Sequence, residues 1–265
     1  MNIPETVNLA DTMEEQVPPD LLEFILKAGG LSQKQQQRLY LVGGAVRDIL
    51  LERITLDIDL VVEGDAIKIA QEMAKINRAK VTLHPRFGTA SLQWRNRRAD
   101  VATARSETYA SPGALPAVKP GTITEDLARR DFTVNAMAIE LNPPHFGELI
   151  DLHHGQRDID KKLSRVLHKT SFIDDATRIW RAIRYEQRLD FNIEPATLTL
   201  IKRDIDRLDT ISGDRIRHEL DLVLKEELPE KALQRAGELG ALSKIHPALK
   251  GDDWLTETFN TAALQ

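Results

Sequence analysis

The spacing of apolar residues changes along the chain, from a mixed pattern in the first half to a helical one in the second. Short apolar or alternating segments predict strands at 39–42, 57–62, 81–83, 90–94, 99–102 and 134–141. Helical spacing predicts helices at 20–29, 45–51, 65–77, 172–189, 195–208, 212–226 and 229–239. The stretch 106–122 is rich in proline and glycine and predicts a loop. The pattern therefore indicates an α+β part followed by an all-α part.

Composition excludes several classes of protein. The chain has 265 residues, of which 42% are hydrophobic, and this is typical of an ordinary globular protein. No apolar run is long enough to cross a membrane, and the first residues lack the pattern of a secretory signal. The absence of cysteine excludes a disulfide scaffold, a thiolate zinc site and a cysteine nucleophile. We therefore expect a cytoplasmic protein.

Charge is distributed unevenly and suggests how the chain is organised. Residues 1–26 hold six acids and no Lys or Arg, and residues 78–105 hold seven bases and one acid. The net charge of −5 therefore conceals a basic middle region, so the acidic total does not exclude nucleic acid as a partner. We predict an acidic, partly disordered leader at 1–26, a head at 27–152, a helical neck at 153–250 and a tail at 251–265.

Two aspartates at alternate positions are the strongest local signal. Asp57 and Asp59 stand in the segment LDIDLVV, and alternate side chains of a strand share one face. Two adjacent carboxylates repel each other unless a cation lies between them, and hard oxygen ligands suit Mg²⁺. A solvent-facing strand with two ordinary aspartates is the alternative. If the two carboxylates share a cation, the pair predicts a magnesium site.

A glycine pair precedes these aspartates. Gly43 and Gly44 lie between a predicted strand and a predicted helix, and Arg47 follows in the first helical turn. Backbone N–H groups at such a turn suit phosphate, and the guanidinium adds a charged donor. The alternative is a tight turn in which glycine serves backbone shape alone.

Two further clusters combine arginine with acid or amide groups. The first is RRDFTVN, with Arg130, Asp131 and Asn135, whose polar side chains could equally satisfy local hydrogen bonds. The second is DDATRIWRAIRY, which contains Asp175, Arg178, Arg181 and Arg184. Its arginines recur every three residues along one helical stripe, and a solvated face of salt bridges is the alternative interpretation.

Together these segments resemble a known family. VGGAVRD, DIDLVVEGD, RRDFTVNAMA, DLHHGQRDI and DDATRIWRAIRY follow one another as in class II, or eubacterial-type, tRNA nucleotidyltransferases and the related bacterial poly(A) polymerases. These enzymes belong to the DNA polymerase beta superfamily, and the resemblance covers residues 35–225. It implies an α+β head, with a polymerase-beta-type mixed sheet and flanking helices, followed by an all-α neck.

The resemblance also implies residue roles. Asp57 and Asp59 would bind metal, and Asp100 stands like a third catalytic carboxylate, although a buried Asp at a strand end would also explain it. The residues expected to bind the nucleotide are Gly43, Gly44, Arg47, Arg130, Asp131, Asn135, Asp175, Arg178, Arg181 and Arg184. Among these, Asp175 and Arg178 would read the base edge of CTP or ATP, and Arg181 and Arg184 would brace that site or the phosphates.

The implied reaction is Mg²⁺-dependent transfer of CMP or AMP from CTP or ATP to the 3′ end of tRNA, with release of pyrophosphate. The resemblance also implies that the presence of the 106–122 loop favours addition of the terminal adenosine, because enzymes that add only the two cytidines tend to lack part of it. Poly(A) polymerase is the alternative within the class, and a catalytically weak RNA-binding module is the alternative outside it. The chain ends soon after ISGDRIRHEL, so we expect a minimal enzyme, a fragment, or a chain whose RNA contacts come from a homo-oligomer or partner.

Overall fold

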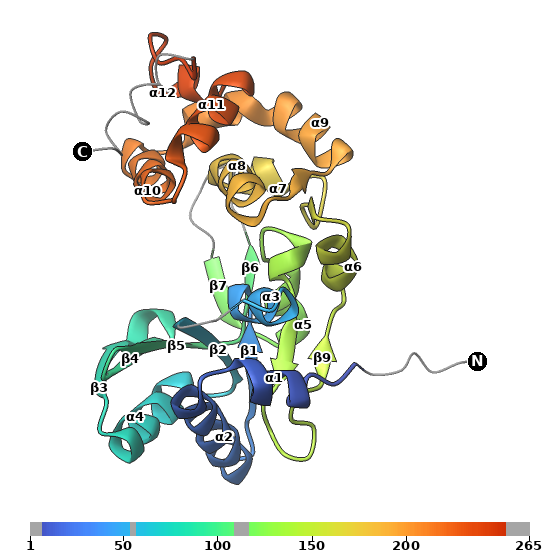
Figure 1. Ribbon diagram of the computed structural model, residues 1–265. Helices are drawn as coiled ribbons and strands as arrows, with labels where there is room; N and C mark the ends of the chain where they lie inside the picture. Colours follow the sequence, from blue (N-terminus) through green and yellow to red (C-terminus); the bar gives the residue numbers. More distant parts are fainter. Residues whose placement is uncertain (1–6, 54–56, 109–116, 253–265) are drawn as a thin grey trace. The chain divides into compact units, whose positions relative to one another are not determined.

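The computed structural model describes residues 7–53, 57–108 and 117–252, with Asp57 described by its backbone alone. The chain divides into two compact units, which Figure 1 shows as a sheet-containing unit and a helical one. The first unit comprises residues 1–107 and 118–159, and the second comprises 108–117 and 160–265. The predicted tail beyond 252 and the centre of the predicted 106–122 loop lie outside the described residues.

The first unit is built on a seven-stranded mixed sheet. Its strands are β1 (Arg38–Val42), β2 (Asp57–Glu63), β3 (Lys80–His84), β4 (Thr89–Trp94), β5 (Arg97–Thr103), β8 (Ala138–Glu140) and β9 (Leu149–Ile150). Their order is β3-β4-β5-β2-β1-β8-β9. The β2–β5 pair is parallel and the other pairs are antiparallel. The sheet and its flanking helices confirm the predicted α+β head.

Helices and a hairpin complete this unit. The helices are α1 (Ala10–Gln16), α2 (Pro19–Lys34), α3 (Gly44–Leu50), α4 (Ala66–Asn77), α5 (Ile123–Ala128) and α6 (Gly155–Asp160). Strands β6 (Arg105–Thr108) and β7 (Ala117–Pro120) form a separate two-stranded sheet.

One face of the sheet is covered by helices. α4 packs against β2, β3, β4 and β5, and α2 packs against β1 and α4 (Figure 1). The alternation of apolar residues along the strands directs Leu60, Leu92 and Val101 into this layer, where all three are buried. Phe24 of α2 stacks on Trp94 of β4 with ring centroids 4.2 Å apart. This layer is the main hydrophobic core of the unit.

The other face is covered only in part. Tyr40, Val42 and Val61 form a small core there with Ile123 and Leu127 of α5. The helix begins with a capping box in which the side chain of Thr122 accepts from the Glu125 N–H. α5 thus covers β1 and β2, and its C-terminal end stands beside the strand carrying the paired aspartates.

The acidic N-terminal segment is packed rather than solvated where the structure describes it. Met13 and Leu21 are fully buried, because their apolar side chains share faces of α1 and α2 while the acids point outward. The helix predicted to end at Gly29 continues to Lys34. Gly29 lies so close to the Leu141 carbonyl that a Cβ would not fit, so this glycine allows close packing and does not end the helix.

The predicted strand at 134–141 is shorter than its apolar run suggests. A 3₁₀ turn occupies Thr133–Asn135, and β8 begins at Ala138. Val134, Ala136 and Met137 are fully buried in spite of this. The segment is apolar because it crosses the core, and periodicity alone cannot distinguish a buried turn from a buried strand.

The second unit is helical, as predicted. Its elements are β10 (Leu163–Ser164), α7 (Ser171–Asp174), α8 (Thr177–Leu189), β11 (Asn192–Ile193), α9 (Pro195–Asp204), a 3₁₀ helix (Ile205–Thr210), α10 (Gly213–Leu224), α11 (Pro229–Glu238) and α12 (Ala241–Ile245). α8 lies at the centre and packs against α7, α10 and α11. Ile179, Trp180 and Ile183 of α8 are fully buried.

A membrane-crossing helix is absent from the described residues, since none of their helices combines the necessary length with sufficient apolar character.

Asn142 provides a test of the sheet packing. This side chain is 3% exposed, accepts from the Leu39 N–H at 2.6 Å and donates to the Gln37 carbonyl at 2.8 Å. Asn142→Ala leaves the N–H of buried Leu39 without its acceptor and removes a donor from the Gln37 carbonyl, so we expect a loss of about 2 kcal/mol in the free energy of unfolding, measured by urea denaturation. Gln71→Ala, on the exposed side of α4, removes an amide from the surface. Equal stabilities for the two variants would contradict this account.

Candidate active site

Two of the predicted carboxylates are brought together by strand pairing. The parallel register of β2 and β5 places Asp59 opposite Asp100. Opposed residues on adjacent strands direct their side chains to the same face, here the face that α4 does not cover. Asp57 lies two residues before Asp59 on β2, in register with Arg98 of β5. Strand pairing therefore adds Asp100 of β5 to the face on which alternation along β2 places Asp59.

A cavity of about 360 Å³ opens at this place in the first unit. Asp59, Asp100 and Arg130 all line it, although 71 positions separate the first from the last in sequence. The other lining residues are Val42, Leu60, Val61, His84, Thr89, Ala90, Ser91, Arg98, Val101, Ala102 and Arg129. The cavity thus gathers residues from two of the predicted clusters.

Asp100 is held by neighbours that the motif pattern did not identify. The hydroxyl of Ser91 donates to Asp100 Oδ1, and Arg98 Nη2 lies 3.0 Å from Asp100 Oδ2. Asp100 is partly exposed, with 43% of its side chain accessible. The alternative of a buried strand-end aspartate therefore does not apply. Ser91 could have been found only by knowing the register of β4 and β5, whereas Arg98 stands two positions before Asp100 on one strand and shares its face by strand alternation.

The donor set suits a divalent cation. Asp59 and Asp100 supply hard carboxylate oxygens from adjacent strands, which is the chemistry that Mg²⁺ prefers. Among the side chains that the structure describes, which omit Asp57, no group of three or more acidic or histidine residues is arranged to hold a metal ion.

Gly43 is shaped to allow a guanidinium to approach the backbone. Its φ is +70°, and a Cβ built on it would lie 2.8 Å from Nη1 of Arg130. A side chain at position 43 would therefore be strained and would displace Arg130. Asp126, fully buried in α5, accepts from Arg130 Nη2 at 2.9 Å and fixes the guanidinium beside the glycine turn. Gly43 and Arg130, from separate motifs, are thus neighbours.

Arg47, Asn135 and Asp131 form a buried chain of hydrogen bonds. Arg47 is 4% exposed; its Nη1 donates to Asn135 Oδ1 at 2.6 Å, and its Nη2 contacts Asp48 at 2.8 Å. Asn135 Nδ2 in turn donates to Asp131 Oδ1 at 3.2 Å. The chain ties α3 to the 3₁₀ turn at 133–135. In this structure these groups contact one another, and their predicted contacts with a nucleotide remain a prediction.

The second unit contains the other predicted cluster. Asp175 Oδ1 accepts from the Thr177 hydroxyl at 2.7 Å and from Arg215 Nη2 at 2.8 Å. Arg178 is 5% exposed, and its Nη1 donates to the Ser171 hydroxyl at 2.7 Å. Asp175 and Arg178 are thus oriented by partners from α7, α8 and α10, and Arg215 belongs to the segment ISGDRIRHEL.

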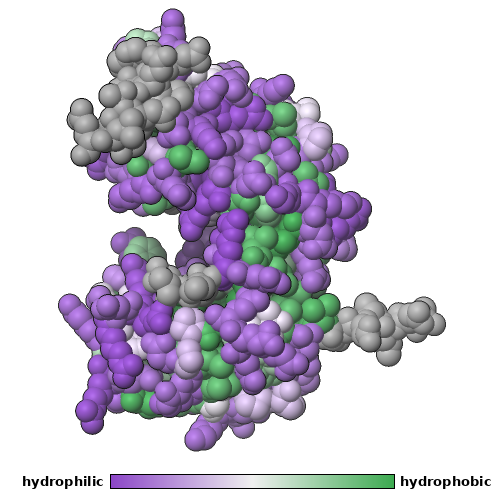
Figure 2. Space-filling model, in the orientation of Figure 1, coloured by the Kyte–Doolittle hydropathy of each residue, from purple (hydrophilic) through white to green (hydrophobic). Residues whose placement is uncertain are grey.

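The arginine stripe of α8 is largely internal. Arg184 is 8% exposed, lies 3.2 Å from Glu226 and stacks over Tyr185 at 4.9 Å from the ring centroid. Figure 2 shows a mainly hydrophilic surface on the viewed face of the helical unit, but Arg178 and Arg184 are buried beneath its surface. The solvated salt-bridge face considered above is therefore wrong for these two positions.

Glu219 of α10 is a buried carboxyl that the motif pattern missed. It is 8% exposed, and burial raises its pKa above the usual 4.5, while the charges of Arg181 and Arg184 oppose the rise. Its Oε2 has no hydrogen-bond partner within the described residues. Glu219 follows Arg215 by one helical turn, so the spacing of DRIRHE was the available signal.

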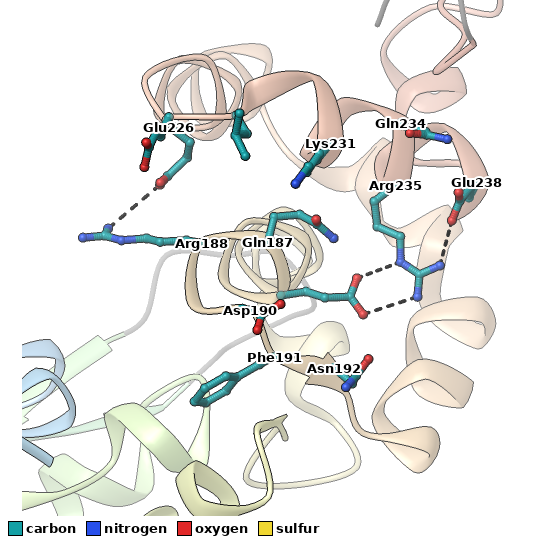
Figure 3. Close-up of a pocket in the computed structure, with 13 residues that line it drawn as sticks. Gln187, Arg188, Asp190, Phe191, Asn192, Glu226, Lys231, Gln234, Arg235 and Glu238 are labelled. Carbon is teal, nitrogen blue, oxygen red and sulfur yellow. Dashed lines mark hydrogen bonds and ion pairs between the residues drawn. The ribbon is translucent and has the colours of Figure 1, made fainter. Parts of the chain in front are cut away.

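A larger cavity, about 680 Å³, lies elsewhere in the helical unit (Figure 3). Its charged groups largely neutralise each other: Arg235 bridges Glu186 at 2.7 Å and Glu238 at 2.8 Å, and Arg188 faces Glu226. None of the predicted site residues lines this cavity. The chemistry-bearing residues therefore do not gather in the larger cavity.

Two families of protein domain match the chain. Residues 39–165 match the poly A polymerase head domain, and residues 190–252 match a segment described as a probable RNA and SrmB-binding site of polymerase A. The first match contains the carboxylates, Gly43 and Arg130, and the second contains Arg215 and Glu219.

Individual relatives agree with these matches. An A-adding tRNA nucleotidyltransferase of Halalkalibacterium halodurans is 41% identical over 239 residues, which is 88% of this chain and 56% of the relative. A solved apo structure of a CCA-adding enzyme matches with a TM-score of 0.89 and 40% identity, over 97% of this chain and 61% of that one. The Thermotoga maritima CCA-adding enzyme complexed with tRNA matches with a TM-score of 0.81 and 40% identity, over 92% and 57%. The chain thus spans little more than half the length of these proteins.

Glu219 leads to a prediction about pH and stability. Because its pKa is raised in the folded protein, native Glu219 binds more protons than unfolded Glu219 in the range above the usual value of 4.5. Its contribution to stability is therefore present at low pH and is lost as pH rises through the raised pKa. Glu219→Gln removes this loss.

We expect the Glu219→Gln variant to match the wild type in acid and to exceed it in melting temperature at neutral and alkaline pH. Glu227→Gln, at an exposed position of the same unit, is the control and should follow the wild type at every pH. A parallel pH dependence for wild type and Glu219→Gln would show that burial does not penalise the charged form.

Proposed function

This chain belongs to the class II tRNA nucleotidyltransferase and poly(A) polymerase family. We propose that it transfers a nucleoside monophosphate to the 3′ end of tRNA, and that this nucleotide is AMP. The observation that carries the proposal is the cavity in which Asp59, Asp100 and Arg130 meet beside Gly43. An acidic pair next to a guanidinium and a glycine turn is suited to a nucleoside triphosphate. Pyrophosphate would be the second product.

The carboxylates supply the reaction centre. Asp57 and Asp59, with Asp100, would hold Mg²⁺, which when bound activates the RNA 3′-hydroxyl and neutralises charge on the leaving pyrophosphate. Arg130, fixed by Asp126 at 2.9 Å, stands where it can contact the phosphates near Gly43. The buried Arg47–Asn135 contact at 2.6 Å keeps α3 and the following turn in place. Catalysis of this kind depends on positioning and charge neutralisation.

Base choice would lie with the helical unit. Asp175 is a carboxylate that can accept from the exocyclic amine of adenine or cytosine, and Arg178 can donate to a ring acceptor. Both side chains are oriented by hydrogen bonds, Asp175 by Arg215 at 2.8 Å and Arg178 by Ser171 at 2.7 Å. C and A both carry an exocyclic amine beside a ring nitrogen that accepts a hydrogen bond. G and U carry a carbonyl beside a ring N–H at these positions, so a rigid pair of this kind would select C and A over them.

Addition of the terminal adenosine is the version of this activity that we favour. The Halalkalibacterium halodurans relative at 41% identity is an A-adding enzyme. Incubation with ATP or CTP separately, on tRNA lacking CCA, CA or A, distinguishes the versions. AMP transfer to tRNA that lacks only the last adenosine supports our proposal. A long adenylate tail on unrelated RNA indicates a poly(A) polymerase instead, and RNA binding without incorporation indicates a non-catalytic module.

The carboxylates provide the first test. We expect Asp59→Asn to reduce incorporation of labelled AMP by about 100-fold or more, because the charge that would hold the metal is lost without a change of shape. Asp57→Asn should behave alike. Asp11→Asn removes an exposed acid of α1 and should leave the rate unchanged. Full activity in both catalytic variants would refute the mechanism.

Base reading provides the second test. We expect Arg178→Ala to reduce the preference for ATP over GTP by about tenfold or more, since a hydrogen bond from a charged donor is worth about 1.5–3 kcal/mol. Arg188→Ala is the control, because Arg188 lies on the same helix with 47% of its side chain exposed. The ratio of kcat/KM values for the two nucleotides is the measurement. An unchanged ratio in the Arg178→Ala variant would exclude a role in base selection.

A further inference from the structure

The sheet face that carries the carboxylates continues beyond them as a polar surface. The register across the strands aligns Asp59 of β2, Asp100 of β5, Ser91 of β4 and Thr82 of β3 in one row. A neighbouring row runs from Arg98 of β5 through Gln93 of β4 to Lys80 of β3. We call Lys80, Thr82, Ser91, Gln93 and Arg98 the β3–β5 face. Ser91 and Arg98 also contact Asp100, but the proposed function assigns this face no ligand.

The β3–β5 face is directly connected to the candidate active site. A small cavity of about 190 Å³ is lined by all five of its residues and by Leu92. Ser91 and Arg98 also line the 360 Å³ cavity that contains Asp59 and Asp100. A ligand that leaves the carboxylates toward the sheet edge therefore passes over this face.

This surface is rigidly supported and accessible. α4 packs on the opposite side of β3, β4 and β5, where Leu92 and Ala99 are fully buried. Strand alternation then places Lys80, Thr82 and Gln93 at exposed positions. Arg98 has 61% of its side chain accessible. The face thus combines two cations and three hydrogen-bonding side chains on a fixed sheet.

The geometry of phosphoryl transfer indicates what approaches from this side. The attacking and leaving oxygens lie roughly in line on opposite sides of the reacting phosphorus. Gly43 follows β1, and β1 and β5 flank β2 on opposite sides. If the leaving phosphates lie near Gly43, as the proposed function requires, the RNA 3′-hydroxyl must come from the side of β5, β4 and β3.

We propose that the β3–β5 face binds the sugar–phosphate backbone of the RNA strand next to its 3′ end, with phosphates at Arg98 and Lys80; this inference rests on the proposed function. Arg98 contacts Asp100 at 3.0 Å in the present structure. The pair is exposed, and exposed ion pairs contribute little stability, so Arg98 can exchange the carboxylate for a phosphate. Adjacent strands are separated by about 4.8 Å, so the face accommodates a short stretch of single strand.

Salt dependence of RNA binding tests the proposal without requiring catalysis. The probe is a fluorescein-labelled single-stranded RNA ending in CC, and its anisotropy is followed with the protein in a metal-chelating buffer. Each phosphate contact with a single strand contributes about 0.7 to the slope of log K against log salt concentration. We expect the slope to fall by about 0.7 in Lys80→Ala and by about 1.4 in the double variant with Arg98→Ala.

The matched control is the double variant Lys68→Ala, Lys75→Ala. Both lysines are exposed on α4, on the opposite side of the same sheet, and their removal changes the net charge equally. Its slope and affinity should equal those of the wild type. Equal losses in the two double variants would show that only net charge matters and would overturn the proposal, as would an absence of RNA binding by the wild type at low salt.

A further variant separates phosphate binding from neutralisation of Asp100. If Arg98 acts only as the counter-ion of Asp100, then Arg98→Ala combined with Asp100→Asn restores the wild-type salt slope, and this overturns the assignment. If Arg98 contacts an RNA phosphate, the combined variant keeps the reduced slope, as we expect. The readout is binding, so loss of activity in Asp100→Asn does not interfere.

The incoming nucleotide is the other source of phosphate. Affinity for a fluorescent ATP analogue with Mg²⁺ should be the same in wild type and in the Lys80→Ala, Arg98→Ala variant. Loss of ATP affinity with unchanged RNA binding would assign the face to the triphosphate and overturn the proposal. Failure of the proposed function is distinguishable, because a wild type that binds RNA with the expected slopes yet incorporates no nucleotide contradicts only the transferase activity.

Discussion

The parallel pairing of β2 with β5 is the constraint on which the candidate site depends. It sets Asp59 beside Asp100 in the only parallel pair of the seven-stranded sheet as described. A shift of register by one residue would turn every side chain of one strand to the opposite face. The buried residues Ile58, Leu60, Ala99 and Val101 prevent such a shift, because each would then leave the core under α4.

Around this pair the charges of the first unit are arranged in two kinds of environment. Arg47, Asn135 and Asp131 are buried and linked by hydrogen bonds that hold α3 to the 3₁₀ turn. Asp126, also buried, accepts from Arg130 at the end of α5. Asp59 and Asp100, by contrast, remain accessible at the cavity. Buried polar groups need partners, whereas groups that bind a ligand must be able to reach it. The same motif residues therefore divide into a supporting layer and a cavity-lining layer.

The helical unit follows a similar plan with fewer accessible groups. Arg178 and Arg184 are buried in α8, and Asp175 is fixed by Arg215 from α10. Glu219 places a further carboxyl beside this cluster, and burial there raises its pKa. The spacing of the arginines predicted the helix and the stripe, and the structure shows that packing against α7 and α10 removes most of this stripe from solvent.

Local patterns along the sequence determined the order of strands and helices, the family, the paired-aspartate strand and the candidate residues, because each depends on spacing between near neighbours. Two predictions from apolar spacing were wrong, namely the full strand at 134–141 and the end of α2 at Gly29. The buried segment contains a 3₁₀ turn at Thr133–Asn135, and Gly29 serves a close packing contact within the helix. Only the tertiary structure showed that Arg98 and Ser91 meet Asp100 and that Gly43 faces Arg130. Ser91 reaches Asp100 through the pairing of β4 with β5, and Arg98 reaches it from two positions earlier on β5. Gly43 and Arg130 come from distant segments, and helix packing brings them together.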